Sequence, residues 1–196
     1  MKNVAILILA AGAASRMRGG DKLLEPVDGV PLLRRQTNAA LATNCRVLVC
    51  LAPDFPMRAN VLDGLAVDQV IVENAGDGMS ASIRAGVAAL GSETGVMILP
   101  ADMPEIDTAD MCHVLAAFAD TTDRIMRGAS ADGIPGHPVL FPRRLFSRLK
   151  KLRGDQGARD ILAGDPAQIV ALPAQHAVTD LDTPEDWTAW RAARGG

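Results

Sequence analysis

Residues 9–22 (LAAGAASRMRGGDK) combine small side chains with three cations, Arg16, Arg18 and Lys22. Small residues let the backbone approach a ligand closely, and free amides in such a loop can bind anionic oxygen. The cations could neutralise the charge of a triphosphate. The segment is not a Walker A loop, because Lys22 follows an aspartate and no serine or threonine comes after it. Taken alone, it could also be a solvated glycine loop with ordinary surface charge.

Two later segments supply carboxylates. Asp102 stands between two prolines directly after an apolar run, and Asp180 and Asp182 lie within residues 179–186 (TDLDTPED). The last two would share one side of an extended chain. By itself Asp102 could be a turn residue or a helix cap, but carboxylate oxygen at the end of a strand is well suited to a hard cation. Together with the cationic loop, these carboxylates predict a Mg²⁺–nucleotide site in which positioning does most of the catalysis.

The elements that must position these residues follow from the hydrophobic pattern. Apolar runs of strand length alternate with segments of helical spacing, and the runs are apolar nearly throughout, as expected for strands covered on both faces. This predicts an α/β fold with a mostly parallel sheet, whose ligands bind at the carboxyl ends of the strands. We expect strands at 4–9, 46–51, 67–72, 95–99, 124–129 and 169–172, and helices at 32–41, 79–90, 108–118, 143–152 and 184–193.

The length of 196 residues predicts a single domain spanning residues 1–196. Residues 132–164 interrupt the alternation of strands and helices and contain frequent glycine and proline. We therefore expect this segment to be an insertion on the substrate side of the sheet.

Composition excludes several classes of function. The net charge of −3 argues against general nucleic-acid or membrane-surface binding. No run of 18 apolar residues exists, so the sequence predicts no membrane-spanning helix. The apolar segment at the start of the chain stops at Gly12, where polar loop residues begin, which favours a buried first strand over a signal peptide. The three cysteines form no CxxC pair, so we expect free buried thiols and a cytoplasmic protein.

With these motifs in view, the chain resembles the MobA-like nucleotidyltransferases. Residues 9–22 look like that family's signature, which many other cytidylyltransferases share. Later motifs resemble the molybdenum cofactor cytidylyltransferase (MocA-like) branch, the GHPVLF and GDQGAR pair being the most specific. The resemblance extends over residues 4–190 and includes GMSASIRAG (78–86), PADMP (100–104), GHPVLF (136–141), GDQGAR (154–159) and DLDTPED (180–186).

This resemblance implies a Rossmann-like three-layer α/β/α sandwich of the nucleotide-diphospho-sugar transferase type. It also implies transfer of CMP from CTP to the phosphate of molybdopterin, with release of pyrophosphate and a molybdenum hydroxylase-type enzyme as recipient of the product. The catalytic residues would be Arg16, Lys22 and Asp102. The nucleotide would contact Ala10, Ala11, Gly12, Arg16, Lys22, Ser80 and Ser82. Mg²⁺ would bind Asp102 and Asp182, with Asp180 as the less favoured second ligand, and the substrate would contact His137, Gly154, Asp155 and Arg159.

The residues fit a direct transfer in which the acceptor's phosphate oxygen attacks the α-phosphorus in line. A phosphate monoester is already largely ionised near pH 7, so neither a protein nucleophile nor a general base is required. Two features bear on the base. Ala11 before Gly12 goes with CTP in the family, whereas the six-residue step from Arg16 to Lys22 is the spacing of the guanylyltransferase pattern. Guanylyl transfer to the same cofactor, or nucleotidyl transfer to another small phosphate, stays open.

Other interpretations compete with this one. Residues 76–81 match GxGxxA, which suggests a dinucleotide-binding oxidoreductase, but three residues separate them from the preceding strand and the chain has no tyrosine. A nucleotide or pterin carrier without turnover would not need both Asp102 and Asp182. His137 could be a turn residue bonded to backbone, and Asp155 and Arg159 could form only a salt bridge at a helix start.

Overall fold

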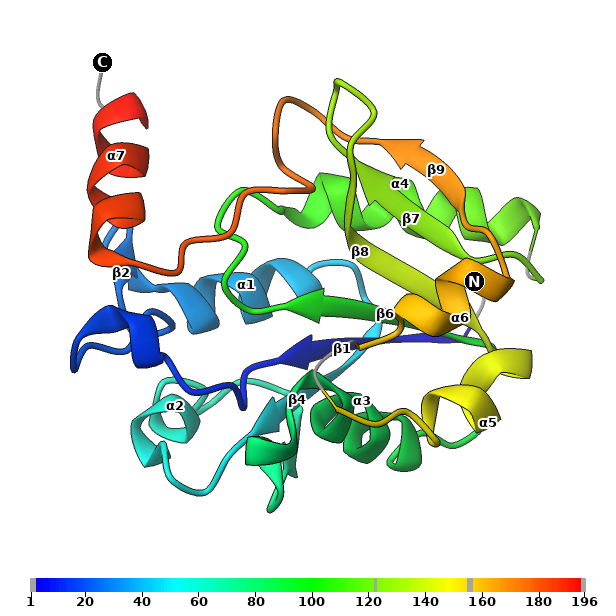
Figure 1. Cartoon of the computed structure of the whole chain (residues 1–196), viewed down its shortest axis with the longest axis horizontal. Coiled ribbons are helices and arrows are strands. Elements are labelled where there is room, and N and C mark those ends of the chain that lie inside the picture. The colour runs from blue at the N-terminus through cyan, green and yellow to red at the C-terminus, as the bar shows by residue number, and fades with distance from the viewer. Residues whose placement is uncertain (1–2, 122, 155–156, 195–196) are drawn as a thin grey trace.

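The computed structural model describes residues 3–121, 123–154 and 157–194. A seven-stranded sheet has the order β5-β4-β1-β6-β8-β7-β9 (Figure 1). Most neighbouring strands are parallel, but β8 runs antiparallel to both β6 and β7. The strands are β1 (Val4–Leu9), β4 (Arg46–Leu51), β5 (Asp68–Ile71), β6 (Gly95–Pro100), β7 (Met126–Ala129), β8 (Pro135–Pro142) and β9 (Gln168–Ala171).

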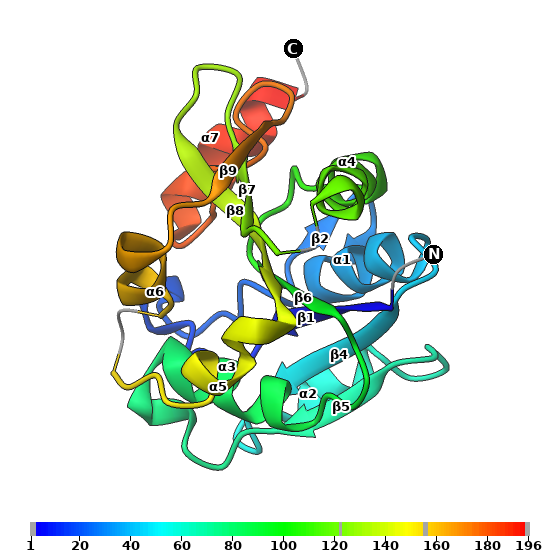
Figure 2. The same cartoon turned by 90° about the vertical axis from the view of Figure 1, so that its right-hand side faces the viewer.

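Helices cover both faces of this sheet, and a small hairpin of β2 (Pro26–Val27) and β3 (Val30–Pro31) precedes the first helix (Figures 1 and 2). Short 3-10 turns occur at Ser15–Met17, Ala75–Asp77 and Arg143–Leu145. The helices are α1 (Leu32–Leu41), α2 (Pro56–Asn60), α3 (Met79–Ala88), α4 (Thr108–Asp120), α5 (Phe146–Leu149), α6 (Arg159–Gly164) and α7 (Pro184–Arg194).

Alternating residues of β1 show how the core forms two layers. Ile6 and Ile8 pack in one cluster with residues of α1 and α4, whereas Ala5 and Leu7 pack in a second cluster with residues of α3 and α5. Both faces of the strand are buried, which explains why its sequence is apolar throughout. The predicted three-layer α/β/α sandwich with a mostly parallel sheet is therefore confirmed.

Residues 132–164 differ from the prediction. The expectation that the whole segment is an insertion beside the sheet is wrong for β8, because this strand lies within the sheet between β6 and β7. Prolines at both ends of this strand, and Pro138 after His137 in its interior, are more typical of turns than of strands. The predicted helix at 143–152 is a 3-10 turn followed by α5, and β2, β3, α2 and α6 were not predicted.

Within the described residues, no helix is long and apolar enough to cross a membrane. The three cysteines are free, as predicted, but only Cys50 is buried, while Cys112 is exposed. Burial raises the pKa of the Cys50 thiol to about 12, so it stays protonated near neutral pH.

Gly136 gives a direct test of how β8 is held. A Cβ at this position would overlap the Ala177 carbonyl, which also accepts the His137 backbone N–H at 2.8 Å. We expect Gly136→Ala to lower the free energy of unfolding by about 3 kcal/mol, measured by urea denaturation. At Gly91 the added Cβ would only reach Glu93 Oε2 at 3.7 Å, so Gly91→Ala is the matched control. Equal stability of the two variants would contradict the close approach at β8.

Candidate active site

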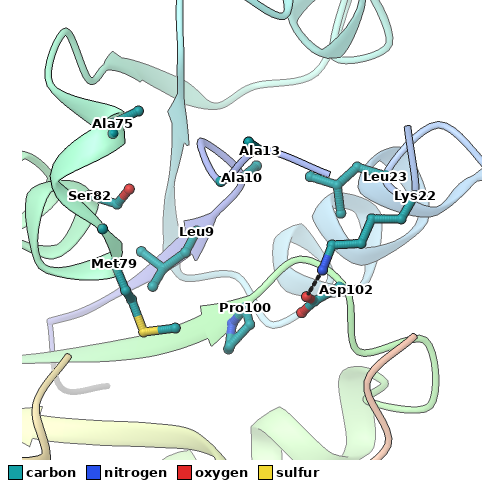
Figure 3. Close-up of a pocket in the computed structure, with 13 residues that line it drawn as sticks. Leu9, Ala10, Ala13, Lys22, Leu23, Ala75, Met79, Ser82, Pro100 and Asp102 are labelled. Atoms are coloured by element: carbon teal, nitrogen blue, oxygen red, sulfur yellow. Dashed lines mark hydrogen bonds and ion pairs between the residues drawn. The ribbon is translucent and has the colours of Figure 1, made fainter. Parts of the chain in front are cut away.

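A pocket of about 360 Å³ opens at the carboxyl ends of β1 and β6 (Figure 3). The loop after β1 forms one side, and the Ala75–Asp77 turn with the start of α3 forms the side that faces it. Its walls are therefore mostly small and apolar, with Lys22 and Asp102 as the charged groups. The lining residues are Leu9, Ala10, Gly12, Ala13, Lys22, Leu23, Ala75, Gly76, Gly78, Met79, Ser82, Pro100 and Asp102.

Charged residues from three distant parts of the chain meet beside this pocket. Lys22 Nζ lies 2.5 Å from Asp102 Oδ2 and 2.5 Å from Asp182 Oδ1. Arg16 Nη1 lies 2.7 Å from the other oxygen of Asp182. Burial opposes the charge of Lys22, but the two carboxylates more than offset this effect and raise its pKa. The structure thus brings together four of the residues predicted to act on phosphate and metal.

The segment that carries Asp182 is fixed by backbone contacts and by α7. The Leu181 N–H donates to the Asp102 carbonyl at 3.2 Å, which ties this segment to the end of β6. Asp186 accepts the N–H groups of Asp182 and Thr183. Trp187 and Trp190 of α7 pack in a small cluster with Leu181. The last helix therefore sets the position of the second carboxylate.

Arg58 of α2 holds the loop after β1 from behind, and no motif in the sequence indicated this. Its side chain is fully buried. Nη1 donates to the carbonyls of Ala10 and Gly12 at 2.7 and 2.8 Å, while Nε and Nη2 form a two-point contact with Asp21. The Ala10 and Gly12 carbonyls thus accept hydrogen bonds from Arg58. They therefore do not compete with a bound anion as acceptors for the N–H groups of the loop.

The remaining predicted nucleotide contacts divide into two groups. Ala10, Gly12 and Ser82 line the pocket with Lys22 and Asp102. By contrast, Ala11 is 2% exposed and packs in the core, and the buried Ser80 accepts a hydrogen bond from Arg84 at 3.1 Å. Neither side chain belongs to the pocket wall.

The predicted substrate contacts that the structure describes do not line this pocket but lie at other cavities. His137 and Arg159 line a second, smaller cavity, and His137 also lines a third one that contains Asp102 and Asp180. Gly154 borders a basic groove with Arg84, Lys150, Lys151 and Arg153. Asp155 lies outside the described residues. Burial, and then the nearby carboxylates Asp182 and Asp102, raise the pKa of Asp180.

The donor set fits a hard divalent cation that keeps ligands from water or phosphate. Two carboxylates converge on the position of the Lys22 ammonium, and both are about five-sixths buried, with side-chain exposures of 18% for Asp102 and 16% for Asp182. Among the described residues, no cluster of three or more Asp, Glu, His or Cys side chains forms a complete protein cage. Mg²⁺ sites commonly have this form, with one or two carboxylates plus substrate phosphates.

Comparison with known proteins decides the family. Residues 6–173 match the model of the MobA-like NTP transferase domain. The chain belongs to this family. This MobA-like protein is therefore a nucleotidyltransferase, as its motifs predicted.

The chain is also similar to individual proteins over nearly its whole length. The chain is 31% identical to the "Probable molybdenum cofactor guanylyltransferase" of Trichormus variabilis over 95% of its own length and 89% of the relative's. It is 29% identical to the purine catabolism protein PucB of Bacillus subtilis, over 95% of each. The crystal structure of Rv0371c from Mycobacterium tuberculosis superposes with a TM-score of 0.85, at 25% identity and 96% coverage of both chains.

The contact between Arg58 and the loop predicts a specific effect on nucleotide binding. Lysine would keep the positive charge, but its single ammonium group cannot bond at once to the Ala10 and Gly12 carbonyls and to both oxygens of Asp21. We expect Arg58→Lys to weaken nucleoside triphosphate binding about tenfold, measured by titration calorimetry at a temperature where the variant is fully folded. The control is Arg34→Lys, because Arg34 also donates to two carbonyls, Val61 and Asp63, but away from the site. Equal losses in both variants would contradict a role in positioning the loop.

The position of Lys22 predicts competition with metal ions. Because its ammonium lies between Asp102 and Asp182, removal of that charge frees two adjacent carboxylates for a divalent cation. We expect Lys22→Met to bind Mn²⁺ about tenfold more tightly than the wild type without nucleotide, measured by electron paramagnetic resonance. Lys22→Met combined with Asp102→Asn is expected to lose that gain. Unchanged Mn²⁺ affinity in Lys22→Met would show that the carboxylates do not form the metal site.

Proposed function

We propose that this nucleotidyltransferase moves CMP from CTP to the phosphate of molybdopterin and releases pyrophosphate. The observation that carries the proposal is the Lys22–Asp102–Asp182 cluster at the edge of a pocket lined by a small-residue loop. The names of its molybdenum cofactor relatives support the acceptor, and the GHPVLF and GDQGAR motifs support it further. On this proposal the product passes to a molybdenum hydroxylase-type enzyme.

In this reaction the loop after β1 binds the triphosphate through its backbone amides. Arg16 and Lys22 then neutralise its charge, and Lys22 exchanges carboxylate oxygens for phosphate oxygens. Asp102 and Asp182 would hold Mg²⁺, which, when bound, supplies charge neutralisation and orientation of the phosphate oxygens. These roles require no covalent chemistry from the chain, since placement of charge is the main source of catalysis in phosphoryl transfer.

In the proposed transfer one bond to the α-phosphorus forms as another breaks, so no protein nucleophile is needed. An oxygen of the acceptor's phosphate forms a new bond to the α-phosphorus of the nucleotide, while the bond from the α-phosphorus to the α,β-bridging oxygen breaks. The electron pair of that bond leaves with pyrophosphate, whose negative charge Lys22 and Arg16 stabilise. The acceptor phosphate is already ionised near neutral pH, so no proton has to be removed by the protein.

GTP is the second candidate for the nucleotide. Molybdenum cofactor relatives named guanylyltransferases favour it, as does the six-residue step from Arg16 to Lys22. Ala11 gives less support to CTP than its sequence position suggests, because its side chain packs in the core. We retain CTP because the later motifs resemble the cytidylyltransferase branch more specifically.

The test is pyrophosphate release with Mg²⁺ and molybdopterin, comparing CTP, GTP, ATP and UTP. We expect release with CTP, and we expect Asp102→Asn to reduce it at least about a thousandfold with an unchanged melting temperature. Release with GTP alone would overturn the choice of base and keep the reaction. No release with any of the four nucleotides, despite nucleotide binding, would overturn molybdopterin as the acceptor.

A further inference from the structure

The pocket at the carboxyl ends of β1 and β6 is called the nucleotide pocket below. Beyond Asp102, two smaller cavities continue from it toward β7 and β8. The nearer one, of about 310 Å³, shares Met79, Pro100 and Asp102 with the nucleotide pocket and adds Arg127 and His137. The farther one, of about 190 Å³, shares Met79, Arg127 and His137 with the nearer one. Its remaining walls are largely apolar and include Ile83, Ile98, Val139, Phe141 and Leu162.

Arg127 of β7 stands where the two cavities meet, and its guanidinium is held by neutral groups. Nε donates to the Gly136 carbonyl at 3.0 Å and Nη2 to the Pro135 carbonyl at 3.2 Å. Over the residues that the structure describes, no carboxylate forms an ion pair with it. Burial, and then the charge of Arg159, lower its pKa. A fixed cation without a counter-charge is suited to bind an anionic ligand.

The nearer cavity needs such a cation if a phosphate is to enter it. Asp102 and Asp180 both line this cavity, and Arg127 is the one cationic side chain among its described lining residues. An ionised phosphate beside two carboxylates would be repelled unless a positive group offsets them. Arg127 is positioned to do so next to Asp102, where an acceptor must meet the nucleotide.

His137 adds a neutral polar group to both cavities. Its Nδ1 atom is buried and has no hydrogen-bond partner among the described residues. Burial, and then the charge of Arg127, lower the pKa of His137 to about 4, so the imidazole is uncharged near pH 7. The Nδ1 atom of His137 can therefore form one hydrogen bond with a ligand without adding charge to the cavity.

We propose that Arg127 anchors the phosphate of the acceptor beside Asp102, while the acceptor's body occupies the apolar cavity and bonds to His137. The ligand class is a phosphate monoester on a largely apolar, ring-sized body. This inference rests on the proposed function, which requires such an acceptor. Two phosphate oxygens can bind the guanidinium while the third stays free to attack the nucleotide.

The experiment compares Arg127→Met, Arg127→Lys and the control Arg124→Met, which alters an exposed arginine outside these cavities. Binding of molybdopterin and of its dephosphorylated form is measured by fluorescence without nucleotide, and CTP binding by calorimetry. We expect Arg127→Met to bind the phosphorylated form at least about tenfold more weakly, with dephosphorylated and CTP binding unchanged and Arg127→Lys intermediate. An unchanged preference for the phosphorylated form in Arg127→Met would overturn the anchor.

A second pair of probes separates this inference from the proposed function. Failure of the wild type to bind or turn over molybdopterin overturns the proposed function, and the anchor is then tested with phenyl phosphate against phenol. The readout is the NMR chemical shift of the His137 ring. A phosphate-dependent shift that Arg127→Met abolishes supports the anchor. The same shift in both proteins, or no phosphate preference in the wild type with either pair of probes, overturns it.

Discussion

The candidate active site depends on the placement of one ammonium group between two carboxylates. Lys22 comes from the loop after β1, Asp102 from the end of β6 and Asp182 from the segment before α7, so this contact joins three distant parts of the chain. Without a cation, the two carboxylates would repel each other in a partly buried site. The lysine satisfies this requirement in the free protein. In the proposed reaction, a metal ion bound with a triphosphate would satisfy it instead, since the triphosphate would offer Lys22 new partners.

Two arginines add to this arrangement. Arg58 lies behind the loop after β1 and holds its carbonyls, while Arg127 lines the cavity proposed for the acceptor. Both are held by backbone carbonyls, so their positions follow from the paths of neighbouring segments. Arg58 therefore supports the loop from the core, whereas Arg127 lines a cavity that shares Asp102 with the pocket at β1 and β6.

The sequence predicted the elements whose signal is local. The strands β1 and β4 fall on the predicted residues, because continuous apolar runs ended by loop residues are typical of buried strands. β8 was missed since its prolines resemble turn signals, and its place between β6 and β7 depends on contacts distant in sequence. Likewise, Lys22 and Asp102 stand in recognisable motifs. Arg58 and Arg127 are isolated arginines whose roles depend on which carbonyls the fold brings to them.

We propose that this site acts by placing charge around a direct displacement, with no covalent intermediate on the protein. The stereochemistry at the α-phosphorus tests this most directly, using a nucleoside triphosphate that carries sulfur at one α-oxygen. A single in-line displacement predicts inversion of configuration in the product. Retention would require two displacements through a protein nucleophile and would contradict the account.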